Sequence, residues 1–159
     1  MHLVRRFFGS LRPDAPSAAD DAWARSFLLP GESALWARMS NPDRRHSVGV
    51  ARETVRILCE DADRPVVAAA LMHDVGKVKS DLGTFARAGA TMVGAIAGRD
   101  RLHGRVGDYL RHDELGAHLL EVAGSDPLTI TWAREHHLPA NRWSLDAPVA
   151  AALKAADDD

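Results

Sequence analysis

The sequence is poor in cysteine, in aromatic residues and in long apolar runs, and each shortage excludes a class of protein. Cys59 is the only cysteine among 159 residues, so the chain has neither an internal disulfide framework nor a cysteine-based zinc site. A reducing compartment, the cytoplasm, is therefore expected. No stretch approaches the roughly 20 apolar residues that a membrane span needs, and the apolar part of the first nine residues is too short for a signal peptide.

An excess of charge of one sign is also missing. Lys and Arg total 20 and Asp and Glu total 22, so the formal net charge is −2. A dedicated nucleic-acid-binding protein needs a positive field to displace counterions from a phosphate backbone, and this composition does not supply one. The length suits one compact domain with a substantial core, and it indicates no oligomeric state.

Residues that favour strands are few. Val, Ile and Thr together number 20 and are scattered, no alternating apolar run is bounded by turn residues, and alanine is the most frequent residue, with 27. Alanine stabilises helices, whereas β-branched residues favour strands. The sequence therefore predicts an all-α domain.

Proline, glycine and capping residues divide the chain into helices. Asn41 is the expected N-cap of one helix, Gly76 is expected to end the most apolar helix in a left-handed conformation, and Gly124 is expected to end another. Residues 1–18 are predicted to form a flexible arm, and residues 19–159 a single domain. The predicted helices cover 19–29, 32–39, 41–60, 65–75, 81–98, 104–111, 113–123, 127–137 and 147–158.

Several polar residues fall on apolar helix faces, where they are costly unless they have partners. His73 and Asp74 end the most apolar helix, and His46 shares a face with Val50 on the helix before it. Asp157 lies on the inward face of the last predicted helix. These four polar residues are therefore expected to meet in the core.

Two further histidines have similar positions. His112 opens a helix whose inward stripe is expected to be Leu115, Leu119 and Val122, and His136 lies one turn after Trp132. A lone inward histidine is usually a hydrogen-bonded core residue, but a helical bundle can collect several of them around metal ions. The complete set of predicted metal ligands is His46, His73, Asp74, His112, His136 and Asp157. Four imidazoles and two carboxylates suit one or two divalent transition-metal ions, such as manganese or iron, with Asp74 able to bridge two ions.

Three segments of the chain resemble a known family. Arg45-His46-Ser47, the string Leu-Met-His-Asp-Val-Gly-Lys over residues 71–77, and Asp157 are similar to the H…HD…D signature of the HD-domain metal-dependent phosphohydrolases. The resemblance covers residues 41–159. It implies a helical bundle of about seven to eight helices with a metal site in its core, in which His46, His73, Asp74 and Asp157 bind the first ion.

The resemblance extends to HD proteins with two ions. The string from Arg111 to Gly116 and the Glu135-His136-His137 segment are similar to their later motifs, which implies a second ion held by His112 and His136 and bridged by Asp74. The chain lacks the Asp-Gly-x-Gly-Tyr-Pro string of the HD-GYP branch, and Pro42 stands where a ligand of a third ion can occur. These departures argue against hydrolysis of cyclic di-GMP and against a three-metal centre.

The resemblance implies hydrolysis of a small phosphoester, of the nucleotide or cyclic dinucleotide class, by metal-activated water. Asp74, Lys77 and His137 are the predicted catalytic residues. Asp74 would orient the ions, and Lys77 is either a phosphate contact or an ordinary solvated cation after a helix end. His137 is a metal ligand, a phosphate contact or a hydrogen-bonding partner of a ligand.

Two other functions remain open at this stage. Some HD proteins are diiron oxygenases with a similar ligand set, so the ligand types alone do not separate the two chemistries. The third reading is a non-catalytic metal-binding signalling domain.

Overall fold

The computed structural model describes residues 14–79 and 112–159, and the regular secondary structure in this part of the chain is all helical. Within these ranges there is no strand, which confirms the predicted all-α class. The helices are α2 (Ala18–Arg25), α3 (Pro30–Trp36), α4 (Asn41–Leu58), α5 (Arg64–Met72), α8 (His112–Ala123), α9 (Pro127–Glu135) and α10 (Ala147–Asp158), with short 3₁₀ turns η1 (Cys59–Asp61), η2 (Val75–Lys79) and η4 (Ala140–Arg142).

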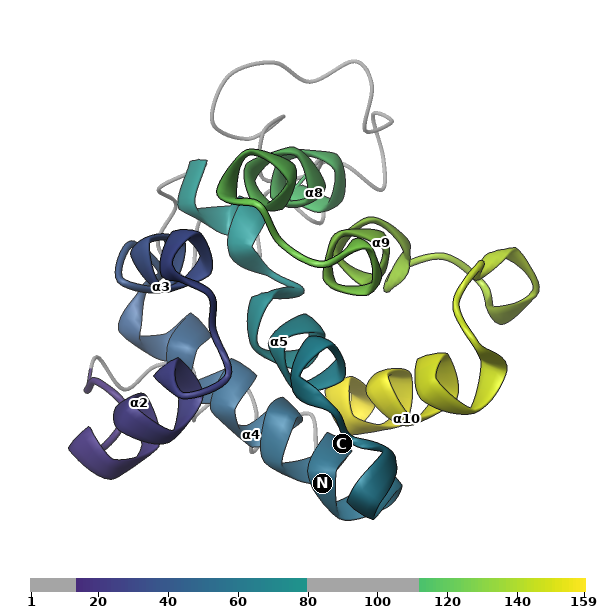
Figure 1. Ribbon diagram of the computed structural model, residues 1–159, viewed down its shortest axis with the longest axis horizontal. Helices are drawn as coiled ribbons and strands as arrows, with labels where there is room; N and C mark the ends of the chain where they lie inside the picture. Colours follow the sequence, from purple (N-terminus) through teal and green to yellow (C-terminus); the bar gives the residue numbers. More distant parts are fainter. Residues whose placement is uncertain (1–13, 80–111) are drawn as a thin grey trace, which may run out of the picture.

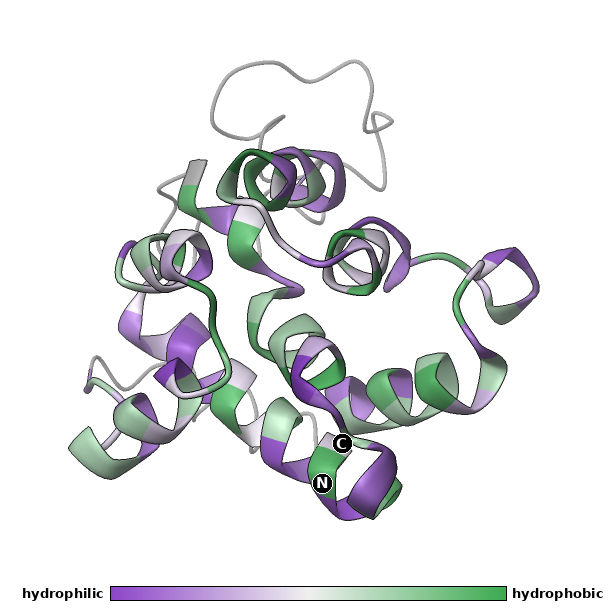
Figure 2. Ribbon diagram, viewed as in Figure 1, coloured by the Kyte–Doolittle hydropathy of each residue, from purple (hydrophilic) through white to green (hydrophobic). Residues whose placement is uncertain are grey.

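Helix α5 lies at the centre of the described bundle, with α4, α9 and α10 packed against it (Figure 1). Its residues from Val66 to Met72 are all buried, as expected for a helix surrounded by others. Figure 2 shows polar residues flanking this apolar helix in the loop before it and the turn after it. The turn after α5 therefore places His73 and Asp74 in the interior.

The helix starts follow local capping chemistry. The Asp63 side chain accepts a hydrogen bond from the backbone N–H of Val66, and Pro65 occupies the first turn of α5. For α4 the cap is Ser40, whose hydroxyl accepts from the N–H of Asp43, so the predicted cap at Asn41 is wrong by one residue. Pro42, expected at the first helical position, is therefore the second residue of α4 and still lies in its first turn.

The predicted role of Gly76 is wrong. Among the described residues, Gly124 is the glycine with a positive φ, of 75°, and it ends α8 as predicted. Gly76 instead lies in the η2 turn, where an added Cβ would come 1.9 Å from the His112 carbonyl oxygen and 2.7 Å from the Gly116 nitrogen. Gly76 is needed because the two backbones touch at this point.

The inward stripe of α8 is also different from the prediction. Val122 is 76% exposed, whereas His112, Gly116, Ala117 and Leu120 are buried. The inward face is centred on a glycine, because Gly116 packs against the backbone of the η2 turn. Searching the sequence for large apolar residues at helical spacing therefore does not identify the buried face of α8.

The remaining predicted boundaries agree to within a few residues, and the last helix begins at Ala147 and ends at Asp158 as predicted. The helices predicted over 81–98 and 104–111 lie outside the described residues, as does most of the predicted arm. None of the helices that the structure describes has the length and apolar character to cross a membrane.

Candidate metal centre

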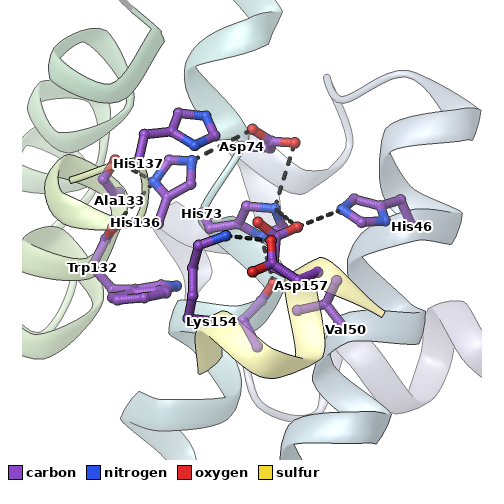
Figure 3. A network of polar contacts seen from close by, with 12 residues as sticks. His46, Val50, His73, Asp74, Trp132, Ala133, His136, His137, Lys154 and Asp157 are labelled. Carbon is purple, nitrogen blue, oxygen red and sulfur yellow. Dashed lines mark hydrogen bonds and ion pairs between the residues drawn. The ribbon is translucent and has the colours of Figure 1, made fainter. Parts of the chain in front are cut away.

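Two groups of ring nitrogens and carboxylate oxygens lie where α5 ends (Figure 3). The first contains His46, His73 and Asp157, and the second contains Asp74, His112, His136 and His137. Within each group, every pair of donor atoms is within 4.8 Å. The six predicted metal ligands, which come from five parts of the chain, are therefore brought together.

The first group joins three helices. His46 on α4 and Asp157 at the end of α10 are 111 positions apart in sequence, yet His46 Nε2 lies 3.1 Å from Asp157 Oδ1. The same oxygen lies 3.6 Å from Nε2 of His73, in the turn after α5. Two imidazoles and a carboxylate at these spacings suit one divalent transition-metal ion.

The second group surrounds the other side of Asp74. Its Oδ1 lies 3.3 Å from His112 Nε2 on α8 and 3.8 Å from Nε2 of His136, which caps α9. His137 Nε2 lies 3.2 Å from His112 Nε2. Sequence reasoning left the role of His137 open, and the structure groups it with the predicted ligands of a second ion.

The two oxygens of Asp74 face different groups. Oδ2 lies 3.4 Å from His73 Nε2, whereas Oδ1 faces His112 and His136. The residue is at most one-twentieth exposed. This division suits the bridging role predicted for Asp74.

Backbone carbonyl groups orient two of the rings. His73 Nδ1 lies 2.9 Å from the Ala70 carbonyl oxygen, and His136 Nδ1 lies 3.0 Å from that of Ala133. A carbonyl only accepts, so each Nδ1 carries the hydrogen and donates. In the neutral ring, Nε2 then presents its lone pair to the site, which is the arrangement that metal-binding histidines use.

The charges of the two groups are coupled. Burial alone would raise the pKa of Asp74, but Lys77 and the surrounding histidines hold it well below its ordinary value. Burial alone would lower the pKa of His73, yet Asp74 and Asp157 raise it. A cation bound here would displace the proton of His73, so acid should weaken binding.

Two buried atoms of the second group fit a metal ion well. Asp74 Oδ1 and His136 Nε2 are both buried and neither makes a hydrogen bond. An unsatisfied buried polar atom costs about 1–3 kcal/mol. A cation between these atoms would satisfy both, and the donor set of imidazoles and a carboxylate has the right chemistry for it.

Lys77 and His137 border the second group. The Lys77 ammonium group forms an ion pair with Asp74 Oδ2, so its predicted phosphate contact stays a prediction. His137 is about one-third exposed, and burial together with the charge of His136 lowers its pKa to about 4. Its ring is therefore neutral at pH 7, as a metal ligand or proton acceptor must be.

Sequence reasoning missed Asp113. The Asp113 carboxylate reaches the second group, with Oδ1 3.1 Å from His112 Nε2. One sequence signal could have found it, because the His-Asp pair of residues 73–74 occurs again at residues 112–113. Sequence reasoning used only the histidine of the second pair.

A hollow of about 450 Å³ opens beside the first group, between α4 and the end of α10. His46 and Asp157 lie in its wall, together with Gly49, three of the four arginines of α4 (Arg45, Arg52 and Arg56) and the acidic residues Glu53 and Asp159. An added Cβ on Gly49 would meet nothing within 4 Å, so there is open space beside this glycine. The volume is within the usual range for small-molecule sites.

Comparison with known proteins gives one match. The family model described as "HD domain" matches residues 44–158. The matched range includes both groups of donor atoms, most of α4 and every later helix among those described. No curated protein and no solved structure matches the chain.

Proposed function

The chain belongs to the HD domain family, and from this premise we propose that it is a metal-dependent phosphohydrolase that acts on a small phosphoester. HD domains are typical of such enzymes. The observation that carries the proposal is the placement of Asp74, with one oxygen toward each of two groups of buried metal-binding side chains.

We assign one divalent ion to His46, His73, Asp157 and Asp74, and a second to Asp74, His112 and His136. When bound, such ions neutralise phosphoryl oxygens and lower the pKa of a coordinated water. The protein contributes a buried, preorganised set of donors whose Nδ1–H groups are held by backbone carbonyls.

His137 is the proposed proton acceptor at the edge of the site. Its low pKa leaves the ring neutral at neutral pH, with one nitrogen free to accept a proton, and its partial exposure keeps the ring accessible to a substrate. Lys77 is proposed to turn from Asp74 to a phosphoryl oxygen when an ion takes over the charge of that carboxylate. Asp74, Lys77 and His137 thus form the proposed catalytic set.

The hollow over Gly49 is the proposed place for the rest of the substrate. It leads to His46 and Asp157, and its volume suits a molecule of nucleotide size rather than a polymer. Arg45, Arg52 and Arg56 line its wall, with Arg52 paired to Asp20 and Arg56 to Glu53, so a phosphate group there would exchange places with these carboxylates. A nucleotide or cyclic dinucleotide is the substrate class that we propose.

The test begins with metal analysis of protein purified without chelator, followed by assay of nucleotides, cyclic dinucleotides and simple phosphodiesters with the metal found. We expect hydrolysis of at least one class, and a loss of about a hundredfold or more in turnover for Asp74→Asn. Asp158→Asn is the control for the loss of one carboxylate charge, because Asp158 is exposed and belongs to neither group of donor atoms, and it should behave as wild type.

Two results would reject the proposal. Failure of the metal-loaded protein on the whole panel, with iron charge-transfer bands and O₂ consumption, would favour the diiron oxygenase. Full turnover by Asp74→Asn would show that the described centre does not perform the hydrolysis.

A further inference from the structure

Asp113 places a third carboxylate beside the two metal-binding groups. It lies in the first turn of α8, directly after His112. Its Oδ1 lies 3.1 Å from His112 Nε2 and 3.9 Å from His137 Nε2. The same oxygen is buried and makes no hydrogen bond.

These spacings agree with the geometry of a shared ion. Ligand atoms about 2.0–2.2 Å from one ion lie about 3 Å apart when adjacent and about 4 Å apart when opposite. The 3.1 Å between Asp113 Oδ1 and His112 Nε2 falls in this range. An ion held by His112 can therefore also contact Asp113 Oδ1 without a change of fold, while His137 Nε2, 3.9 Å from that oxygen, stays at the edge of the site as the proposed proton acceptor.

We propose that Asp113 is a ligand of the second metal ion, which gives that ion a carboxylate of its own as Asp157 gives one to the first. The proposal rests on the two-ion centre described under the proposed function. It places a carboxylate on each side of the shared Asp74.

Charge favours this arrangement. Two divalent ions bring four positive charges into a buried site, where repulsion between them is strong. Asp74 and Asp157 neutralise two of these charges, and Asp113 neutralises a third. Because carboxylate oxygens suit manganese and iron, Asp113 also shifts the second position toward these metals.

The neighbouring residue supplies a matched control. Glu114 carries the same charge one position later, but its side chain is 71% exposed and pairs with Arg134. A substitution at Glu114 changes the charge of α8 by the same amount without reaching the site. Any difference between the two variants therefore reports on the contact with the ion.

The experiment measures Mn²⁺ binding to the full chain, by isothermal titration with a competing chelator, for wild type, Asp113→Asn and Glu114→Gln. We expect two ions for wild type and Glu114→Gln. For Asp113→Asn we expect the second ion to bind at least tenfold more weakly, with the first unchanged. The retained first ion shows that the variant is folded.

X-ray absorption at the manganese edge gives an independent readout, since loss of an oxygen ligand lowers the oxygen count around the metal. Wild-type affinity for both ions in Asp113→Asn would overturn the proposal, as would a single ion in the wild type. Neither readout uses catalysis. Two ions with an Asp113-dependent second site and no phosphoester hydrolysis would support Asp113 while rejecting the proposed function.

Discussion

The charge of Asp74 and the direction of its two carboxylate oxygens both depend on the residues around it. A carboxylate buried to this degree is costly in isolation, and its low pKa reflects a positive Lys77 and three histidines placed around it. The same surroundings divide its oxygens between two groups. At the residue scale, the centre is an arrangement of partners around this one side chain.

Gly49 provides a prediction at the same scale. Glycine within a helix costs up to about 1 kcal/mol relative to alanine, and an added Cβ here meets nothing within 4 Å. We therefore expect Gly49→Ala to raise the free energy of unfolding by up to about 1 kcal/mol. Gly49→Leu should fill the hollow and lower kcat/KM for the phosphoester that the enzyme hydrolyses, by about tenfold.

Both Gly49 variants should keep the wild-type metal content, which elemental analysis checks. Unfolding in urea measures the first effect, and steady-state kinetics measures the second. An unchanged kcat/KM for Gly49→Leu would show that the hollow does not receive the substrate.

At the element scale, the second group of ligands depends on how closely η2 approaches α8. Gly76 and Gly116 lie at this contact, and together they let the His112 turn lie beside Asp74. Helix α9 then packs on α8 and α5 and brings His136 to the other side. Small residues thus position the large polar ones.

Substitution at this contact should have graded effects. An alanine Cβ at Gly76 would overlap the His112 carbonyl oxygen at 1.9 Å, so Gly76→Ala should destabilise the fold by about 1–3 kcal/mol or more and weaken the second ion. At Gly116 the nearest atom is 3.1 Å away, and Gly116→Ala should be milder. Urea unfolding in the presence of chelator measures the stability of the two variants, and Mn²⁺ titration measures the affinity of the second ion. Equal stability of Gly76→Ala and Gly116→Ala would contradict this account.

At the scale of the whole molecule, the first group of ligands connects the end of the chain with its first half. His46 and Asp157 tie α10 to α4, and α5 lies against both helices. Burial alone would raise the pKa of Asp157, but the hydrogen bond from His46 and the charge of His73 hold it well below its ordinary value. The contact therefore links stability to pH.

Proton linkage gives the direction in which the free energy of unfolding changes with pH. A carboxyl group whose pKa is lower in the folded state stabilises the fold above its unfolded pKa, near 4, and loses this contribution as the pH falls. We expect the free energy of unfolding of the metal-free protein to fall between about pH 5 and pH 3, and to fall less steeply in Asp157→Asn. Urea unfolding in chelator across this range measures it, with Asp158→Asn expected to match wild type.

Most of the helices that the structure describes could be predicted from the sequence. Apolar periodicity, prolines in first turns and the stop at Gly124 act over a few residues, so they are readable along the chain. The six predicted ligands could be named because each falls on an apolar face or in a motif. Their roles in metal binding and catalysis stay predictions.

Other features were decided by tertiary packing. Asp113 lies beside the second group of ligands. Gly76 is required by a close contact between two backbones and not by a left-handed helix end. Val122 is exposed to solvent because Gly116, on another face of α8, is the residue that packs inward. Each depends on the distance between helices that are far apart in the chain. The sequence alone determined the helices and the residues available to a metal, because these follow from local chemistry. Only the folded chain decided which of those residues meet, because that depends on how closely the backbones can approach.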